Sequence, residues 1–421
     1  MRVLVALDAR FDQTPDGAVW SAWMPPQYWA PYLEAFETVA CVARVRQAPE
    51  VPGDWHRVDS DRVQFAPVPY YLGSAAFVRH AWSVRRAVQR ALGPADAVVL
   101  HGGSQVATQL VPLLARRGRP YGVQVIGDPY DVFAPGVVSH PLRPLLRWWL
   151  SRRLRQQCLG ASCVTYVTKQ SLQRRYPART DAFSTSCSDV ELPPSAFVES
   201  PRRPVVRTGP HRLLMVGSLA QLYKAPDVLL DAVELCAAQG LDLQLTLIGD
   251  GRFRPGLEAN CRERGLDARV RFLGQLPSGA AVREQMDRAD LFVLPSRTEG
   301  LPRAMIEAMA RGMPCIGSTV GGIPELLPPE DLVPPGNAVA LAAKIQQVFA
   351  DTSRMAQMSA RNLAVASEYR QEALWGRRVE FYHELRARTE NWLAARAARG
   401  NGRETVTALQ TNSLSRYSGR G

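Results

Sequence analysis

The feature that most constrains the fold is a regular alternation of short apolar runs with longer helical patterns. In the second half of the chain, the apolar runs fall at residues 212–216, 243–248, 270–273, 291–294 and 314–317. The first half repeats this arrangement, with apolar runs at residues 2–7, 63–67, 97–100, 122–126 and 162–167. Strands that alternate with helices form parallel sheets with right-handed crossovers. The sequence therefore predicts an α/β protein with two doubly wound, Rossmann-like sheets.

Length and composition divide this pattern into domains. A chain of 421 residues is too long for one hydrophobic core. We expect an N-terminal domain over 1–195, a proline- and arginine-rich linker over 196–211, and a C-terminal domain over 212–365. Residues 366–398 should be helical and pack back on the N-terminal domain, and the polar tail 399–421 should be disordered. Two such domains place the carboxyl ends of their strands face to face across a cleft.

Composition argues against several classes of protein. No run of eighteen apolar residues occurs, and the N-terminus resembles a first strand more than a signal peptide, so we expect a cytoplasmic protein. The seven cysteines are scattered and form no metal-ligand grouping with the six histidines, so no metal or other cofactor is expected. The net charge of +12 suits an anionic membrane surface, whereas no nucleic-acid-binding motif is present.

The segment 290–312 carries the most specific chemistry. An apolar strand pattern runs into a turn with Glu299 and Gly300, and a helix follows from Pro302 to Gly312. The free N–H groups at the start of that helix and its dipole form an anion site. Glu307, about five residues into the helix, can accept two hydrogen bonds from a vicinal diol such as ribose. The alternative interpretation is an amphipathic helix with two solvated glutamates.

Other strands of the second half also end in glycine turns. Gly217 follows the first strand, and Lys224 precedes a helix; this lysine is either a mobile charge opposite a diphosphate or an ordinary surface residue. The Gly249 turn and the Leu273-Gly274 pair should open onto the same edge of the sheet. The paired glycines Gly321 and Gly322 precede another helix start and offer a second anion-binding geometry.

Together these motifs resemble the donor-binding domain of the family 4 retaining glycosyltransferases, which have the GT-B fold. The resemblance covers residues 212–335 and includes Lys-x-Pro-Asp, Gly-Asp-Gly, Phe-Leu-Gly, Glu-x7-Glu and Gly-Gly-x-x-Glu in order. It implies that Lys224 contacts the donor diphosphate, Glu307 the ribose, and Glu299 the sugar. The positions that it assigns to donor binding are Gly217, Ser218, Gly249, Leu273, Gly274, Gly300, Leu301, Glu307, Gly321 and Gly322.

The sequence departs from the family pattern at two places. The family often has arginine at the position of Ser218, so Lys224 either acts alone or is assisted by Arg303 or Arg297. Many members carry a histidine at the end of the strand that corresponds to residues 122–126, where this chain continues to Asp128. That carboxylate can bind a sugar or acceptor hydroxyl, or it can stabilise an Asp-Pro turn. His101, at the end of another strand, is the second catalytic candidate of this domain, with a structural role as the alternative.

The acceptor side is expected in the N-terminal domain. The first loop, with Gly17, occupies the position of the family's acceptor- and phosphate-facing glycine loop, and Trp20 comes just after it. Its aromatic ring can stack on a sugar or a lipid carrier, or it can form part of the core. The basic and aromatic stretch 143–155 can lie on an anionic bilayer or pack against its own sheet with solvated arginines.

The sequence therefore predicts a nucleotide-sugar-dependent hexosyltransferase that acts with retention in polysaccharide or glycoconjugate biosynthesis. Its acceptor would be a glycan or a lipid-linked molecule, with peripheral contact to the inner face of the membrane and no nucleic-acid partner. A nucleotide-sugar epimerase with the same fold, and a non-catalytic binder of nucleotide sugars or nucleic acids, are the alternatives.

Overall fold

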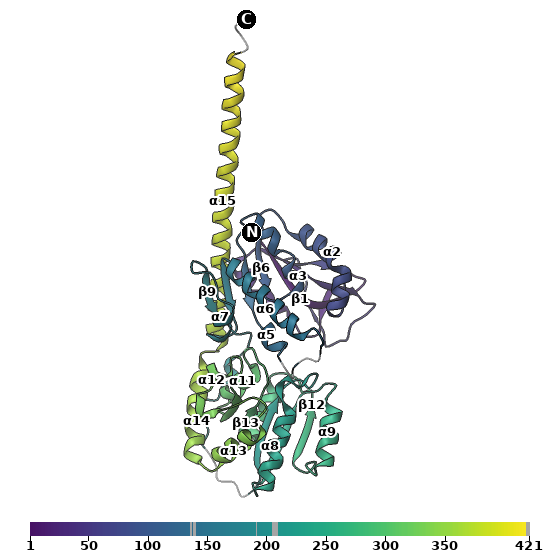
Figure 1. The fold of residues 1–421 in the computed structure, drawn as a ribbon, viewed down its shortest axis with the longest axis vertical. Helices are drawn as coiled ribbons and strands as arrows, with labels where there is room; N and C mark the ends of the chain where they lie inside the picture. The colour runs from purple at the N-terminus through teal and green to yellow at the C-terminus, as the bar shows by residue number, and fades with distance from the viewer. Residues whose placement is uncertain (135–136, 138–139, 191, 204–208, 418–421) are drawn as a thin grey trace.

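A computed structural model describes residues 1–134, 137, 140–190, 192–203 and 209–417. They form a nine-stranded sheet in the first half of the chain and a six-stranded sheet in the second half. Figure 1 shows the two halves as stacked lobes, with the long C-terminal helix running beside the N-terminal lobe and projecting beyond it. This is the two-domain α/β architecture that the alternation of strands and helices predicts.

The N-terminal sheet is mostly parallel, in the order β5-β3-β1-β6-β7-β8-β9, and the short strands β2 and β4 add an antiparallel extension beside β1. Its strands are β1 (Arg2–Gln13), β2 (Val19–Ser21), β3 (Thr38–Gln47), β4 (His56–Arg57), β5 (Val63–Val68), β6 (Ala97–His101), β7 (Gly122–Val125), β8 (Cys163–Tyr166) and β9 (Phe183–Ser186). Its helices are η1 (Pro26–Trp29), α1 (Ala30–Ala35), α2 (Gly73–Ala91), α3 (Gln105–Thr108), α4 (Val111–Arg116), α5 (Pro129–Val132), α6 (Arg143–Gly160) and α7 (Ser171–Arg175).

The C-terminal sheet is wholly parallel, in the order β12-β11-β10-β13-β14-β15. Its strands are β10 (His211–Val216), β11 (Leu243–Ile248), β12 (Val270–Gly274), β13 (Leu291–Leu294), β14 (Cys315–Ser318) and β15 (Leu332–Val333). Its helices are η3 (Leu222–Lys224), α8 (Pro226–Ala238), α9 (Arg254–Glu263), α10 (Ala280–Arg288), α11 (Arg303–Ala310), α12 (Ile323–Leu326), η4 (Pro329–Asp331), α13 (Ala338–Phe349) and α14 (Thr352–Ser367). The strand order reverses between β10 and β13, which opens a ligand crevice at their carboxyl ends.

The expected strands of the first half are present, but four further strands accompany them. The most important is β3, which pairs in parallel with both β1 and β5 at the centre of this part of the sheet. Its charged residues interrupt the apolar pattern, and the structure shows why they are tolerated: Arg44 and Arg46 form ion pairs with Asp8 and Asp12 on β1. Residues 105–116 form two short helices, α3 and α4, rather than one, because Pro112 begins a new helical turn.

The C-terminal helix α15 (Gln371–Tyr417) packs against α1, β6, β8 and β9 of the N-terminal domain. The rings of Tyr382 and Tyr32 stack with their centroids 4.2 Å apart, and Arg386 donates to the Ala35 carbonyl at 2.8 Å. The helix continues to Tyr417 where the polar composition predicts a disordered tail. The Ala- and Arg-rich turns before residue 399 provide a formed helix onto which the following residues extend.

The two domains touch along the cleft. Glu325 of α12 accepts hydrogen bonds from the N–H groups of Lys169 at 2.5 Å, Gln170 at 3.1 Å and Ser171 at 2.5 Å, at the start of α7. Lys169 also forms an ion pair with Glu368, the residue after α14. A carboxylate at the positive end of a helix is electrostatically favourable, so Glu325 holds the edge of the N-terminal domain beside the C-terminal sheet.

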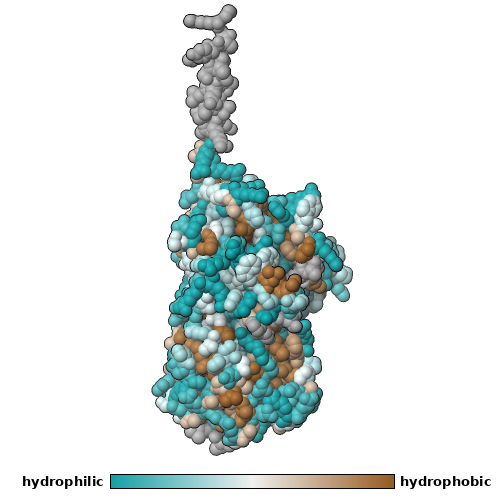
Figure 2. Space-filling model, viewed as in Figure 1, coloured by the Kyte–Doolittle hydropathy of each residue, from teal (hydrophilic) through white to brown (hydrophobic). Residues whose placement is uncertain are grey.

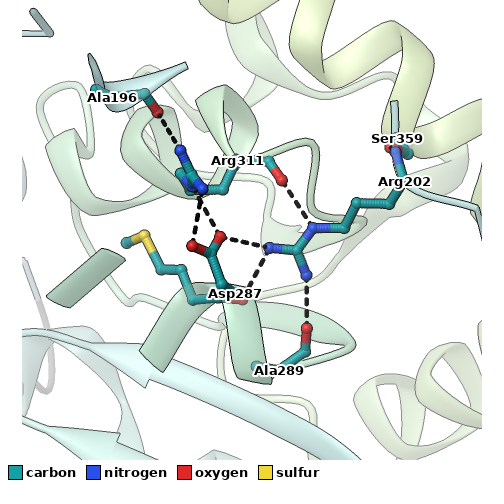
Figure 3. Close-up of polar contacts among 7 residues, drawn as sticks. Ala196, Arg202, Asp287, Ala289, Arg311 and Ser359 are labelled. Carbon is teal, nitrogen blue, oxygen red and sulfur yellow. Dashed lines mark hydrogen bonds and ion pairs between the residues drawn. The ribbon is translucent and has the colours of Figure 1, made fainter. Parts of the chain in front are cut away.

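The linker is anchored to the back of the C-terminal domain by Arg202 (Figure 3). Its guanidinium donates to the carbonyls of Arg311 at 2.7 Å, Ala289 at 2.6 Å and Met286 at 2.8 Å. Asp287 receives the paired Nε and Nη2 of Arg311 at 2.8 and 2.7 Å, and the Arg202 backbone N–H donates to the Ser359 hydroxyl. Arg202 therefore fixes the end of α11, whose other end faces the cleft.

We expect Arg202→Met to lower the free energy of unfolding by about 2–3 kcal/mol, because a charged donor to three carbonyls is lost. Thermal or urea unfolding of the variant would measure this. The matched control is Arg203→Met, since Arg203 is the neighbouring residue and is exposed. Equal stability of the two variants would contradict the anchoring role.

Candidate active site

A cavity of about 490 Å³ lies at the carboxyl ends of the strands, between the two domains. Its C-terminal wall includes the loops after β10, β11, β12 and β13, and its N-terminal wall is formed by Ile126, Val167 and Asp189. This volume is typical of a pocket for a small molecule. Among the predicted donor positions, those that line it are Gly217, Ser218, Lys224, Gly249, Glu299, Gly300, Leu301 and Glu307.

The start of α11 faces this cavity. The helix follows the buried strand β13, whose four side chains are all fully buried, and Pro302 occupies its N-cap position in an extended conformation. Gly300, Leu301, Pro302 and Arg303 line the cavity. The first N–H groups of a helix have no partner within it, so this end of α11 presents positive potential to the cavity.

Lys224 and Glu299 form an ion pair inside the cavity. Their Nζ and Oε1 atoms are 2.7 Å apart, and the side chains are only 13% and 9% exposed. The Ser296 hydroxyl donates to the same Glu299 oxygen at 3.0 Å. Lys224 lies across Gly217, where a Cβ atom would be 2.1 Å from the lysine Cδ, so a side chain at this position would displace the lysine. Arg297, one candidate to assist Lys224, is instead paired with Asp227.

Glu307 lies one turn further along α11 and also lines the cavity. Burial raises the pKa of its carboxyl group, and the nearby charges of Arg303 and Arg283 oppose that effect. Desolvation disfavours the charged form of a carboxylate, and hydrogen bonds that a ligand donates to it stabilise that form. The geometry therefore suits recognition of neighbouring hydroxyl groups, with Arg303 close enough to influence the charge.

The paired glycines have a different role from the predicted one. Neither Gly321 nor Gly322 is among the residues that line the cavity. The Gly322 N–H donates to the Gly300 carbonyl at 2.6 Å, and a Cβ atom on Gly321 would lie 1.8 Å from the Glu299 carbonyl oxygen. The prediction of a second anion site is therefore wrong for the Gly322 amide, which is already occupied. Because they have no side chains, these glycines let the backbone of residues 321–322 pack directly against the Glu299-Gly300 turn.

In the loop after β12, the residues that line the cavity come later in the chain than the sequence predicts. Leu273 and Gly274 do not line the cavity, and the Gly274 carbonyl accepts from the Gly249 N–H at 2.8 Å. Gln275, Leu276 and Ser278 line it instead. Sequence reasoning also missed Asp189 in the N-terminal wall, because the strand that precedes it, β9, has a polar pattern. The only local signal was an aspartate in the loop before the linker.

Asp128 does not reach the cavity. It is the N-cap of α5, accepts from the Tyr130 N–H at 2.8 Å, and is 6% exposed. Its carboxylate also accepts from the Tyr176 hydroxyl and pairs with Arg175. The catalytic assignment of Asp128 is therefore corrected in favour of the turn-stabilising alternative, because its lone pairs are used within the N-terminal domain.

His101 ends β6, and its Nε2 atom lies 3.2 Å from the Tyr28 hydroxyl. Burial lowers the pKa of its imidazole to about 4, so the ring is neutral at physiological pH. It is absent from the lining of the 490 Å³ cavity. The geometry thus supports the structural alternative for His101.

The predicted acceptor residues lie in a hairpin between β1 and β2. Gly17 donates its N–H to the Thr14 carbonyl at 2.9 Å, and the Trp20 indole donates to the Thr14 hydroxyl at 3.1 Å. Neither residue lines the cavity, because β1 extends past the sheet edge before the chain turns back. The structure therefore does not bring Gly17 and Trp20 to the donor positions.

Helix α6, the basic and aromatic stretch, packs on the sheet and also exposes a surface. Leu154 and Cys158 are buried, whereas Leu145 and Trp148 are 56% and 59% exposed. Figure 2 shows hydrophobic residues interrupting the hydrophilic surface on the face that carries α5 and α6. Among the described helices, none is both long and apolar enough to cross a bilayer. One face of the helix therefore packs within the N-terminal domain, and the other exposes apolar side chains to solvent.

Part of the chain matches a family of known proteins. Residues 210–351 match the family described as Glycosyl transferases group 1. Protein CapJ of Staphylococcus aureus is 23% identical over 321 residues, which cover 76% of this chain and 79% of CapJ. The amylovoran biosynthesis glycosyltransferase AmsK of Erwinia amylovora is 32% identical over 194 residues, 43% of this chain and 47% of AmsK. Alpha-D-kanosaminyltransferase of Streptomyces kanamyceticus is 25% identical over 374 residues, 80% and 93% of the two chains.

Solved structures show the same fold. Sucrose-phosphate synthase from Thermosynechococcus elongatus superposes with a TM-score of 0.66 at 19% identity, covering 91% of this chain and 99% of that one. HepE of Anabaena, solved in complex with UDP, has a TM-score of 0.59 at 19% identity and covers 93% and 100%. WaaG, a glycosyltransferase of lipopolysaccharide biosynthesis, has a TM-score of 0.59 at 14% identity and covers 90% and 98%. The two-domain arrangement is therefore that of the GT-B glycosyltransferases.

Proposed function

We infer that this chain is a GT-B glycosyltransferase whose residues 210–351 belong to the Glycosyl transferases group 1, and that it moves a sugar from a nucleotide diphosphate to an acceptor hydroxyl with retention of configuration. The observation that carries this proposal is the cavity itself. One space holds a helix N-terminus, the Lys224 ammonium and the Glu307 carboxylate. The helix N-terminus and Lys224 suit the anionic diphosphate of a nucleotide sugar, and Glu307 suits its hydroxyl groups.

The chemical step breaks the bond between the sugar anomeric carbon and the diphosphate oxygen. The bonding electrons leave with the diphosphate, so negative charge grows there in the transition state. Lys224 and the start of α11 are placed to stabilise that charge. The acceptor oxygen then bonds to the same face of the anomeric carbon, and its proton passes to the departing phosphate oxygen. This route requires no protein nucleophile.

Binding of a donor would replace the Lys224–Glu299 ion pair with contacts from each residue to the donor. The bound diphosphate would attract Lys224, and Glu299 would then accept hydrogen bonds from sugar hydroxyls. Ser296 holds the Glu299 carboxylate in place during this exchange, since its hydroxyl donates to Oε1 at 3.0 Å. Lys224 thus serves the leaving group, and Glu299 orients the transferred sugar.

Release of nucleotide from a panel of UDP-, GDP- and ADP-sugars tests the proposal, and a UDP-sugar is the first choice because HepE is solved with UDP. Product analysis completes the test. An epimerised sugar nucleotide without free nucleotide would identify an epimerase and overturn the transferase proposal. Binding without any conversion would identify a non-catalytic binder.

We expect turnover to be independent of added divalent metal, because Lys224 and the α11 N-terminus supply positive potential to the leaving group. Among the described residues, no group of three or more metal-ligating side chains is close enough to hold an ion. The measurement is turnover before and after exhaustive chelation. Loss of activity that magnesium or manganese restores would show this electrostatic account to be wrong.

We further propose that the acceptor is presented at an anionic membrane surface and that α6 contacts it. Exposed Leu145 and Trp148 are accompanied on the helix by the exposed residues Arg152 and Arg155. Apolar insertion combined with electrostatic attraction gives reversible, salt-sensitive binding.

Charge reversal at Arg152, Arg153 and Arg155 should therefore reduce co-sedimentation with anionic vesicles at least several-fold at low salt. Neutral vesicles and the same variant at high salt are the controls. If the wild-type protein does not bind anionic vesicles at low salt, the proposal that α6 contacts a membrane that presents the acceptor is wrong.

A further inference from the structure

A second, smaller cavity of about 100 Å³ lies at the carboxyl ends of β7 and β8, beneath α15. Ile126, Val167 and Asp189 line both this cavity and the larger one, so the two adjoin. The shared boundary is near the turn that faces the transferred sugar, because a Cβ atom on Gly300 would lie 3.0 Å from the Ile126 carbonyl oxygen. A group held in the small cavity would therefore lie beside the reacting end of the donor.

The walls of the small cavity are fixed by a network of buried polar groups. The Tyr32 hydroxyl donates to Gln124 Oε1 at 3.0 Å, and Gln124 Nε2 donates to the Tyr382 hydroxyl at 2.8 Å. The Tyr32 and Tyr382 rings also stack on each other. Buried networks whose members are satisfied are rigid, so this wall gives the cavity a defined shape.

Two other lining groups are not satisfied in this way. Thr165 is 8% exposed, and its Oγ1 atom has no hydrogen-bond partner among the described residues. Arg378 of α15 donates to the Ser188 carbonyl at 2.9 Å but takes part in no ion pair with any described carboxylate. Buried hydroxyls are nearly always hydrogen-bonded in native proteins, so the unpartnered Thr165 hydroxyl is unusual. Both groups can donate hydrogen bonds to an anion.

We propose that the small cavity binds an anionic group of the acceptor, a carboxylate or a phosphate, through Arg378 and Thr165. The inference rests on the proposed transferase function and defines its acceptor class. A space of about 100 Å³ holds one such group and no sugar chain, so the remainder of the acceptor extends toward the cleft. Asp189 is exposed and lies on the shared boundary, where its carboxylate can accept a hydrogen bond from the reacting hydroxyl.

The test uses the full chain saturated with UDP, so that the diphosphate positions of the larger cavity are occupied. Inorganic phosphate is titrated by ³¹P line broadening and acetate by saturation transfer to its methyl protons. We expect Arg378→Met to weaken binding of the preferred anion at least 10-fold and Arg378→Lys to weaken it less. The control, Arg388→Met, removes an arginine of the same helix that pairs with Glu384 away from the cavity, and should bind like the wild type.

Thr165→Val separates ligand binding from a structural role. It removes a buried hydroxyl that has no hydrogen-bond partner among the described residues, so thermal stability should be unchanged or higher. Anion affinity should nevertheless fall about 3- to 10-fold, because a hydrogen-bond donor to the ligand is lost. The anion whose binding depends on these residues identifies the acceptor group as phosphate or carboxylate.

Binding of both anions that is unaffected by Arg378→Met would overturn the inference, and so would an unchanged affinity in Thr165→Val. Failure of the proposed function looks different, because the wild-type protein would then release no free nucleotide from any nucleotide sugar, whether or not it binds one. In that case the same titrations without UDP still show whether an anion occupies the cavity lined by Arg378.

Discussion

Replacing Lys224 by alanine should reduce kcat about 100- to 1000-fold while the affinity for the nucleotide sugar changes less. The reason is that negative charge on the departing diphosphate grows in the transition state, and removal of one well-placed donor from such a site has effects of this size. Lys224 is only 13% exposed, so bulk water does not replace its charge efficiently. Steady-state kinetics of nucleotide release would measure the change.

Two further variants make this prediction specific. Lys224→Arg keeps the positive charge and should retain more activity than Lys224→Ala. Glu299→Gln keeps the hydrogen bond from Ser296 but removes the charge that pairs with Lys224 at 2.7 Å. If Lys224→Ala retains full turnover, another cation, such as Arg303, stabilises the leaving group.

Replacing Glu307 by alanine should weaken donor binding by about 1.5–3 kcal/mol, because hydrogen bonds from ligand hydroxyls to a carboxylate are lost. This corresponds to a dissociation constant about 10- to 150-fold higher. Calorimetric titration with the nucleotide would detect it. The folded protein should lose little stability, since burial of an unpaired carboxylate is itself unfavourable. A large drop in melting temperature with unchanged donor affinity would identify Glu307 as a structural residue.

The raised pKa of Glu307 also predicts the pH dependence of donor binding. Its carboxyl group protonates at higher pH than an ordinary glutamate, because burial disfavours the charged form. Donor affinity should therefore begin to fall as the pH is lowered through this raised value. The sign for folding is opposite, since protonation relieves the buried charge and stabilises the folded state relative to the unfolded one. Glu307→Gln should remove the dependence on pH that arises from this residue.

Within the C-terminal domain, the sequence predicted both the sheet and the location of the cavity. Strong apolar runs bounded by glycine turns mark strands buried on both faces, and a parallel sheet collects their carboxyl ends at one edge. Lys224, Glu299 and Glu307 each follow such a strand, so the fold necessarily brings them to the same crevice. In the N-terminal domain the pattern was weaker. Arg44 and Arg46 interrupt β3, and their partners on β1 lie more than thirty residues earlier.

By itself, the sequence determined five of the six strands of the C-terminal sheet and the edge at which the functional residues gather, because local periodicity fixes the buried faces. Only the tertiary structure decided which side chains pair. Asp128 is held by Arg175 and Tyr176, and Gly322 is held by Gly300, so neither is left for a ligand. Likewise, Thr165 and Arg378 are 213 positions apart by their numbering and share one cavity because α15 returns to the N-terminal domain. Such contacts depend on how whole helices and strands pack, and short-range sequence patterns do not predict that packing.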